Sequence, residues 1–464
     1  MDAIKEEATS TVKSRDVGLF EKYHVVRAHL RADTGVIMTA RYIGPKSLEQ
    51  NELYAALGSV LQKHRALSTQ VHDADTDRPY YVSLKSVDLS QVVHFHGSDE
   101  ISLEAVIDSY LVNRFEYGSP TPLWRLGVMT DNTLIFHYDH CIGDGQSGVA
   151  FHSDLLDALN TVSSNSEVES STLVLVPDIL KLQPALEDAM KVSLSFIKIF
   201  WLILSMIVPA RWQKSSSTWT GNVVSRRETS TRVRTRLWTI SPDQADRLLK
   251  ICRAHKTTIT SFIYVIGIAA LSKLLEYESA HWQYRHLAVV VPVSLRRFTK
   301  SPLGSFCDHV GGISWFPLIP GGPSKVAANP WNTAANHTTA LRKQVPKAAE
   351  DIALLKLLGG KYVPYFEGMF GKKRSTTLEI SNVGRFPSNG AKDKGEGGWQ
   401  IEDMFFGQSN AIFGSAFKLS AVGSQNGSLG LCVNWTEGVV EEDVAQRFVD
   451  CFREFTENAW KVEI

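Results

Sequence analysis

The chain has 464 residues, more than the roughly 250–300 that one hydrophobic core usually organises, so we expect two domains. It carries 49 basic and 49 acidic side chains, and this balance gives no electrostatic basis for a nucleic-acid partner. Hydrophobic residues make up 44% of the chain and charged residues 21%, which excludes an intrinsically disordered protein.

Cysteine content and the N-terminus indicate the compartment. The five cysteines are scattered and include no CxxC pair, so we expect neither a disulfide framework nor a zinc module. The N-terminal stretch MDAIKEEATSTVKSRD is charged and lacks the apolar segment of a secretory signal. Both observations favour a reducing, cytoplasmic location.

Residues 1–180 are expected to form an N-terminal lobe of helices and mostly antiparallel strands. In residues 47–64 apolar side chains recur at helical spacing, which predicts an amphipathic helix packed on a core. Residues 123–130 and 133–140 flank an Asp-Asn pair and predict a hairpin. Residues 146–159 return to helical spacing, so the segment between the hairpin and this helix connects a strand to a helix.

Residues 181–230 are expected to form a linker that contains one strongly apolar helix. The stretch 192–208, VSLSFIKIFWLILSMIV, is 17 residues long with a single charge, Lys198, and lies at the short end of what can span a bilayer. Three placements are open: a buried or lobe-bridging helix, a peripheral membrane contact, or a membrane span. The first is the ordinary placement, whereas the second would make the protein membrane-associated.

Residues 231–464 are expected to form a C-terminal lobe. Ser241, followed by proline and then by a glutamine at the capping-box position, predicts the start of a helix. A second helix is expected over 259–275, a hairpin around the Asn-Gly turn at 426–427, and a last helix over 441–455. Together with the N-terminal lobe, these elements predict an α/β protein with mixed sheets.

The segment FHYDHCIGDGQSG, residues 136–148, concentrates two histidines, two aspartates and three glycines between a strand and a helix. On an extended strand His137 and Asp139 face one side and His140 faces the other, so they cannot converge on one ion, and we expect no metal site. A nucleophile elbow requires G-x-S-x-G, and Val149 stands at the position of the last glycine, two residues after Ser147. Ser147 is therefore not expected to be a nucleophile.

Two interpretations of this segment remain from spacing alone. A histidine at a strand end, before a glycine-bearing loop, can present one ring nitrogen to a cleft with a pKa near working pH, so His140 is a candidate general base. Asp144 lies between two glycines and would brace the turn rather than take part in chemistry. The alternative is a purely structural polar turn, and spacing does not decide between the two.

HCIGDG, from His140 to Gly145, resembles the HxxxDG signature of the acyltransferase superfamily that includes chloramphenicol acetyltransferase and the condensation domains of peptide synthetases. Further segments resemble elements of this superfamily in the same order along the chain. They are LYAALGSVLQKHRAL, CRAHKTTITSFIYVIGIAAL, VPVSLRRF and LEISNVGRFP. The overall pattern is most similar to the fungal-type alcohol acetyltransferase family.

The resemblance implies two lobes of the chloramphenicol-acetyltransferase type with an active-site tunnel between them. His140 would be the general base that takes a proton from an acceptor hydroxyl or amine as it attacks an acyl thioester. Asp144 would point away from the substrate and pair with Arg296, with Gly145 completing the loop. Candidate oxyanion or substrate-binding residues are Ser381 and Asn382, with Gln408 and Ser409 as alternatives.

The resemblance also implies co-substrates rather than a tightly bound cofactor. These would be acyl-CoA, acetyl-CoA in the simplest case, and an alcohol acceptor such as a secondary metabolite. One alternative is a condensing or product-releasing enzyme whose donor is an acyl chain on a carrier protein, and another is an inactive binding protein on the same scaffold. No residue is assigned to CoA; the basic segment 371–375, GKKRS, is either a phosphate-docking patch or an ordinary charged loop.

Two departures narrow the resemblance. Condensation domains prefer HHxxxDG, but Asp139 precedes the base in this chain, which disfavours peptide-bond formation. Plant members carry DFGWG, and the corresponding EDMFFGQS retains only Phe406 and Gly407. The plant subfamily is therefore disfavoured, while neither change affects the base.

Overall fold

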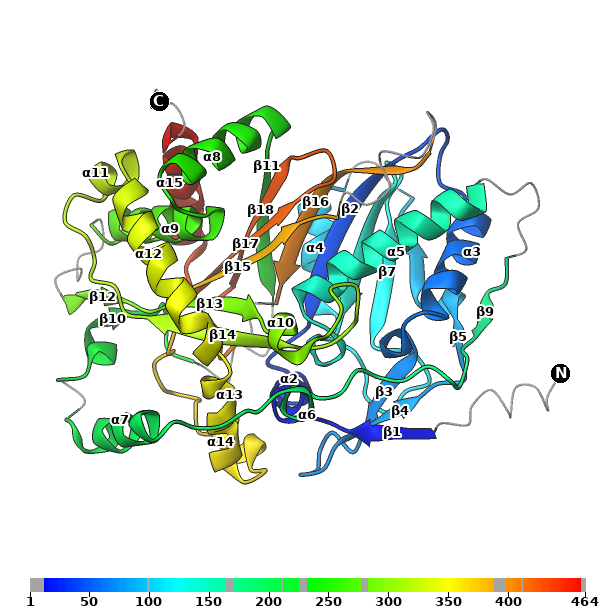
Figure 1. Cartoon of the computed structure of the whole chain (residues 1–464), viewed down its shortest axis with the longest axis horizontal. Helices are drawn as coiled ribbons and strands as arrows, with labels where there is room; N and C mark the ends of the chain where they lie inside the picture. Colours follow the sequence, from blue (N-terminus) through cyan, green and yellow to red (C-terminus); the bar gives the residue numbers. More distant parts are fainter. Residues whose placement is uncertain are drawn as a thin grey trace.

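The chain has a mixed α/β architecture built on two large sheets that lie side by side (Figure 1). This class is the one that the sequence predicts. Parts of the expected lobes and linker, residues 1–11, 210–211, 225–230 and 460–464, lie outside the described residues. The computed structural model describes residues 12–97, 101–163, 170–209, 212–224, 232–276, 283–387, 398–409 and 412–459.

The first large sheet has the strand order β16-β2-β8-β7-β6, and its pairs are antiparallel except β6 with β7. Side chains alternate along β2, so Val36 and Met38 pack in the core with α3 and α5, whereas Ile37 packs with α4 on the other face. The elements are β2 (Val36–Ile43), α3 (Gln50–Leu61), β6 (Val93–Phe95), α4 (Leu103–Val112), β7 (Trp124–Val128), β8 (Thr133–Tyr138), α5 (Gly145–Ser163) and β16 (Gln400–Gln408).

The second large sheet has the order β11-β18-β17-β15-β13-β14. Its β13–β15 and β15–β17 pairs are parallel and the other three are antiparallel. Helices α8, α9, α12 and α15 pack with it in the second core cluster. The elements are β11 (Val233–Ile240), α8 (Pro242–Ala254), α9 (Ile259–Leu275), β13 (Val289–Ser294), β14 (Val310–Trp315), α12 (Trp331–Gln344), β15 (Leu378–Arg385), β17 (Phe417–Gly423), β18 (Leu429–Thr436) and α15 (Glu442–Ala459).

Shorter elements surround the two sheets. Three strands, in the order β1-β4-β3, form a small sheet at the end of the first lobe, and two strand pairs, β5–β9 and β10–β12, are smaller still. The strands are β1 (Val12–Asp16), β3 (Thr69–His72), β4 (Tyr80–Ser83), β5 (Ser86–Asp88), β9 (Leu173–Leu175), β10 (Thr218–Trp219) and β12 (His286–Leu287). The helices are α2 (Leu19–His29), α6 (Leu186–Ala189), α7 (Phe196–Ile207), α10 (Arg296–Thr299), α11 (Pro323–Ala328), α13 (Glu350–Leu354) and α14 (Tyr362–Glu367).

Local signals in the sequence explain where several elements begin and turn. The Ser241 hydroxyl accepts from the Gln244 backbone N–H, while the Gln244 side chain accepts from the Ser241 backbone, so α8 begins with a complete capping box. Between β17 and β18, Gly427 has φ of 97°, a conformation that favours glycine. The Asn426 side chain accepts from the Ser428 backbone N–H at 2.8 Å, which closes the turn.

Strand β16 links the two lobes, because it comes from the C-terminal part of the chain yet completes the first sheet. It pairs antiparallel with β2, from Gln400 opposite Ile43 to Gln408 opposite Val36. The expected assignment of all residues from 231 to 464 to the C-terminal lobe therefore does not hold for this strand. Such a pairing, between segments more than 350 residues apart, leaves no local pattern in the sequence.

Helix α7 lies at the surface, next to α13 (Figure 1). Phe196, Phe200, Ile203 and Ile207 are 90%, 61%, 53% and 73% exposed, and their spacing of four, three and four residues places them in one stripe. Of the three placements left open by the sequence, a buried helix is therefore contradicted by these exposed side chains. Within the described residues no single helix has the length and apolarity to cross a bilayer; α8 and α9 meet these criteria only jointly, across a 95° bend.

The contact between β18 and β16 can be tested at Gly430. A Cβ added there would lie 1.9 Å from the carbonyl oxygen of Met404, so the two backbones would have to separate. We expect Gly430→Ala to lower the free energy of unfolding by about 1–3 kcal/mol, measured by urea denaturation. Gly304→Ala is the control, since its Cβ would meet nothing within 4 Å. Equal stability of the two variants would contradict the close contact.

Candidate active site

The loop that carries His140 is held by hydrogen bonds at both ends. Strand β8 ends at Tyr138, and the side chain of the following Asp139 accepts from the backbone N–H of Cys141 at 2.9 Å. The Tyr138 hydroxyl donates to the backbone carbonyl oxygen of Asp144 at 2.7 Å. These bonds fix the turn between strand and helix, so the position of the His140 backbone is set by its neighbours.

The other polar side chains at the end of β8 form hydrogen bonds away from the His140 cavity. His137 is fully buried, its Nε2 lies 2.6 Å from the carbonyl oxygen of Thr34, and burial lowers its pKa to about 3. Asp139 also accepts from the hydroxyl of Tyr117 at 2.9 Å. Neither residue lines the cavity that contains His140. The expectation that His137 and Asp139 face away from His140 agrees with this geometry.

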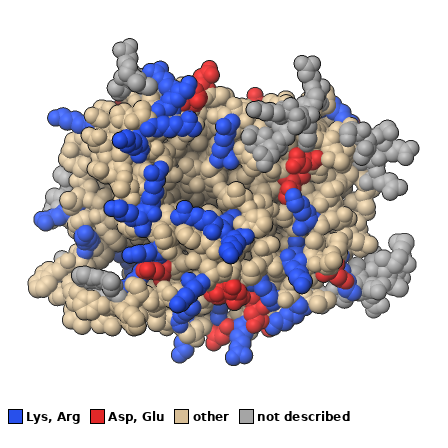
Figure 2. Space-filling model, viewed as in Figure 1, with Lys and Arg blue, Asp and Glu red and all other residues tan. Residues whose placement is uncertain are grey.

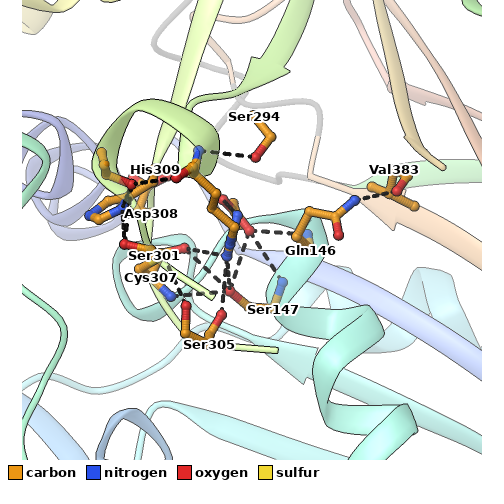
Figure 3. A network of polar contacts seen from close by, with 12 residues as sticks. Gln146, Ser147, Ser294, Ser301, Ser305, Cys307, Asp308, His309 and Val383 are labelled. Carbon is orange, nitrogen blue, oxygen red and sulfur yellow. Dashed lines mark hydrogen bonds and ion pairs between the residues drawn. The ribbon is translucent and has the colours of Figure 1, made fainter. Parts of the chain in front are cut away.

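Asp144 and Arg296 form a buried ion pair between the two lobes. Arg296 Nη1 lies 2.5 Å from Asp144 Oδ2, and both side chains are 1% exposed. The guanidinium also donates to the carbonyl oxygens of Ser305 and Cys307 at 3.1 and 3.3 Å (Figure 3). Burial opposes the charge on Arg296, but the carboxylate outweighs it and raises the arginine pKa above its ordinary value.

The second oxygen of Asp144 holds the start of α5. Its Oδ1 accepts from the backbone N–H groups of Gln146 and Ser147 at 3.0 and 3.2 Å. Helices begin with unpaired N–H groups, and a carboxylate satisfies them well. The Ser147 hydroxyl bonds to Asp144 and to the backbone of Cys307, so Ser147 is a structural residue, in line with its expected lack of a nucleophilic role.

Gly145 is required by the close packing of α5 on two strands. A Cβ at this position would lie 2.4 Å from Cγ1 of Val383 on β15 and 3.0 Å from Cζ of Phe406 on β16. Valine is rigid about χ1, so it cannot move aside easily. The glycine therefore lets the first turn of α5 approach both strands, and it places the His140 loop beside the second sheet.

His140 opens into a cavity of about 260 Å³ at the junction of the lobes. Its side chain is 19% exposed, and Nδ1 is buried, which leaves Nε2 as the nitrogen available to the cavity. Burial lowers the pKa of His140 below its ordinary value of 6.5. The ring is therefore neutral at physiological pH and can accept a proton.

The four expected oxyanion or substrate-binding residues are not equivalent in the structure. Ser381, Gln408 and Ser409 line the His140 cavity. Gln408 donates to Glu379 at 3.0 Å, and the Ser409 hydroxyl accepts from the backbone of Thr34 at 3.2 Å. Within the described part of the chain no hydrogen bond is recorded for the Ser381 hydroxyl, so it is the best placed of the three to donate to a substrate.

Asn382 does not line the His140 cavity, which corrects its expected role. It faces a second cavity, of about 530 Å³, on the other side of β15, together with Arg385 and the start of α8. Its side chain donates to the Thr260 hydroxyl at 3.1 Å and accepts from the backbone N–H of Gly384 at 2.9 Å. The two cavities thus flank one strand, and the larger one holds no histidine.

Two further residues of the site, His24 and Asp308, were not predicted from the sequence. The His24 ring, on α2, is stacked on the His140 ring, with centroids 3.9 Å apart and planes 7° from parallel. Asp308, just before β14, is fully buried, and its Oδ1 lies 3.8 Å from His140 Nδ1. Neither residue belongs to a recognisable motif, because each comes into the site only through tertiary packing.

His24, His140 and Asp308 have the composition of a metal site, since one ligand atom of each lies within 4.8 Å of the others. A metal ion lies in the plane of each imidazole that binds it, along the nitrogen lone pair. The two rings are parallel and stacked, so their lone pairs do not converge on one point. The arrangement does not fit an ion unless one ring rotates, and the three residues are better described as a cluster of ionisable groups.

A family model for alcohol acetyltransferases matches residues 16–456 of the chain. The chain belongs to the alcohol acetyltransferase family. The family implies an acyltransferase that uses acetyl-CoA and a small-molecule acceptor. A relative is the probable alcohol acetyltransferase crmB of Aspergillus fumigatus, 25% identical over 429 residues that cover 85% of this chain and 87% of that protein.

Solved structures of other proteins share the fold of this chain. The TRI3 trichothecene 15-O-acetyltransferase from Fusarium sporotrichioides matches with a TM-score of 0.70 and 13% identity, covering 97% of this chain and 96% of that one. The epimerization domain from the third module of tyrocidine synthetase B matches with a TM-score of 0.61 and 14% identity, covering 98% of each. The fold is thus the one that the HxxxDG resemblance implies.

Removing the Asp144 carboxylate should leave Arg296 charged and unpaired in the protein interior. We expect Asp144→Ala to lower the free energy of unfolding by about 3–5 kcal/mol, measured by chemical denaturation. The matched control is Glu457→Ala, which breaks an exposed ion pair with Arg453 and should cost less than about 1 kcal/mol. A similar loss in both variants would mean that burial of the first pair has no energetic consequence.

Proposed function

We propose that this protein transfers an acyl group, acetyl in the simplest case, from a CoA thioester to an alcohol, with His140 as general base. The observation that carries the proposal is the position of His140, whose imidazole is neutral and reaches a cavity between the lobes through Nε2. The family membership supports the reaction class. A hydroxyl, with its high pKa, attacks a thioester readily only if its proton leaves in the transition state.

The reaction then proceeds without an acyl-enzyme. The acceptor oxygen bonds to the thioester carbonyl carbon while its proton passes to Nε2 of His140. The tetrahedral intermediate collapses, the carbon–sulfur bond breaks, and the thiolate takes the proton from the imidazolium. The Ser381 hydroxyl, in the same cavity, would donate to the oxyanion, and such donors contribute roughly 10²–10³ in rate.

The two cavities on either side of β15 favour separate entry of donor and acceptor. Lys and Arg side chains surround a hollow near the middle of the face in Figure 2, as a phosphate-bearing donor would require. The expected patch at 371–375 contributes less, because Lys373 donates to the carbonyl oxygens of Ser215 and Ser216 and Arg374 is only 3% exposed. The CoA phosphates would therefore bind elsewhere.

The test is release of free CoA from acetyl-CoA with a panel of alcohols. We expect His140→Ala to lower kcat by about 10²–10⁴ because the base is lost, with His94→Ala, an exposed histidine, as control. A parallel assay offers the acetyl group on a phosphopantetheinylated carrier protein. Turnover only in that assay would replace the CoA donor, and no turnover with either thioester would overturn the enzymatic function.

We also propose that α7 contacts a lipid surface. Its apolar stripe has no acidic side chain and is followed by Trp212, which is 71% exposed, as in helices that lie at a membrane interface. Lys191 and Lys214 flank the helix and are exposed, which suits an anionic headgroup layer. Lys198 instead pairs with Asp351 and holds the helix to the protein.

The lipid contact can be measured by co-sedimentation with vesicles of phosphatidylcholine and phosphatidylserine. We expect the double variant Phe196→Glu and Phe200→Glu to weaken vesicle binding by about 100-fold, because two aromatic side chains no longer enter the interface. Ile179→Glu, at a side chain that is 85% exposed but outside the helix, is the control. A wild-type protein that stays in the supernatant would refute the contact.

A further inference from the structure

The proposed mechanism leaves a cluster of buried ionisable groups beside His140 without a role. His24 lies on α2, and Asp308 lies two residues before β14 begins. Their side chains are 5% and 0% exposed. His24 Nε2 lies 3.5 Å from Asp308 Oδ2, and His140 Nδ1 lies 3.8 Å from Asp308 Oδ1. One carboxyl group therefore lies beside the two stacked imidazoles, with one oxygen toward each.

The polar atoms of this cluster make no hydrogen bond of ordinary geometry within the described residues, although the His140 ring also faces its own backbone and His24 also faces Asp33. Both nitrogens of His24, Nδ1 of His140 and both oxygens of Asp308 are buried without a hydrogen bond. Leaving one such atom unpaired typically costs about 1–3 kcal/mol, so these atoms are expected to pair with one another. A movement of about 1 Å would bring both separations into hydrogen-bond range, and such bonds are often long in unliganded enzymes.

Other charges around the cluster are already paired. Asp33 binds Arg27 at 3.0 Å and accepts from the backbone N–H groups of Thr34 and Gly35. Its Oδ2 lies 4.0 Å from His24 Nδ1, too far for a hydrogen bond.

The remaining nearby charges are neutralised in the same way. Arg296 pairs with Asp144, and Lys418 lies 3.7 Å from Glu379. No cation is therefore left to neutralise Asp308 within the described part of the chain. Burial raises the pKa of Asp308, whereas burial and the neighbouring His140 lower the pKa of His24, so the two groups share a single proton.

Two positions of that proton leave His140 in the same state. If His24 carries it, Asp308 is a carboxylate and Oδ1 accepts from His140. If Asp308 carries it on Oδ2, toward His24, then Oδ1 is a carbonyl oxygen and still accepts. In both states the proton of the neutral His140 ring is drawn to Nδ1, which leaves the lone pair of Nε2 free for the acceptor.

We propose, on the basis of the function proposed above, that Asp308 and His24 are positioning residues that fix the tautomer and plane of His140. Asp308 selects the form with the proton on Nδ1 and stabilises the imidazolium that forms when the acceptor loses its proton. His24 holds the second oxygen of Asp308 and, by stacking, sets the plane of the His140 ring. Asp308 does not line the cavity and acts only through His140, whereas His24 lines the cavity beside the His140 ring.

The kinetic test uses Asp308→Asn and His24→Phe in the CoA-release assay. We expect Asp308→Asn to lower kcat by about 10²–10⁴ with little change in KM, because the wrong tautomer becomes populated. Losing the carboxylate should also move the acidic limb of the kcat/KM profile to lower pH, since an imidazolium is then less favoured. His24→Phe keeps a ring in the stack but loses the proton partner, so we expect at least about a 10-fold loss in kcat.

The matched control is His337→Phe. His337 is also buried and stacked on an aromatic ring, Tyr264, with centroids 3.7 Å apart and planes 8° from parallel, and it lies outside the His140 cavity. It should keep wild-type kcat and pH profile. Asp308→Asn and His24→Phe variants that also keep kcat within 2-fold of wild type would overturn the proposal.

A second measurement does not depend on turnover. In ¹⁵N-histidine-labelled wild-type protein, imidazole nitrogen shifts report which nitrogen of His140 is protonated, with His140→Ala giving the assignment. We expect the proton on Nδ1, and a proton on Nε2 would overturn the proposal. If wild type turns over no thioester while His140 has its proton on Nδ1, the proposed function fails and the tautomer assignment stands.

Discussion

The buried ion pair of Asp144 and Arg296 is the interaction on which the site depends. It joins the loop after β8 to the segment after β13, so it ties the first sheet to the second across the cavity. Both oxygens of the carboxylate are used, one for the guanidinium and one for the start of α5. Because both charges are desolvated, removing one of them would leave the other buried without a partner, which is strongly destabilising. The pair therefore holds the His140 loop in place.

Packing around this pair determines what can face the substrate. Gly145 allows α5 to approach Val383 and Phe406, which bring β15 and β16 to the cavity wall. Ser381 lines the same cavity, and the His24 ring is stacked on that of His140. The site is therefore assembled from both sheets and from α2, and no single lobe contains it.

Much of the site could be predicted, because the HxxxDG motif and the VPVSLRRF strand are compact local patterns. Apolar helices were also predictable, and α9 covers the expected residues 259–275. Asn382 was assigned to the wrong cavity for a simple reason: adjacent residues on a strand face opposite sides, so Ser381 and Asn382 cannot both face His140.

What the sequence could not reveal depends on long-range packing. His24 sits in a helix whose sequence has no clear amphipathic pattern, and Asp308 belongs to no recognisable motif. The stack of two imidazoles arises when α2 docks beside the loop after β8, and no local rule encodes that contact. The placement of α7 was open for a related reason, since an apolar helix is compatible with a core, a surface and a bilayer.

The pairing of β16 with β2 also constrains how the protein is made. During synthesis β2 leaves the ribosome early, but its partner at residues 400–408 emerges only near the end. Until then one edge of the first sheet exposes unpaired N–H and C=O groups, which other chains could bind. The N-terminal half therefore cannot finish folding by itself, and nascent chains of this protein have a long period in which protection by chaperones matters.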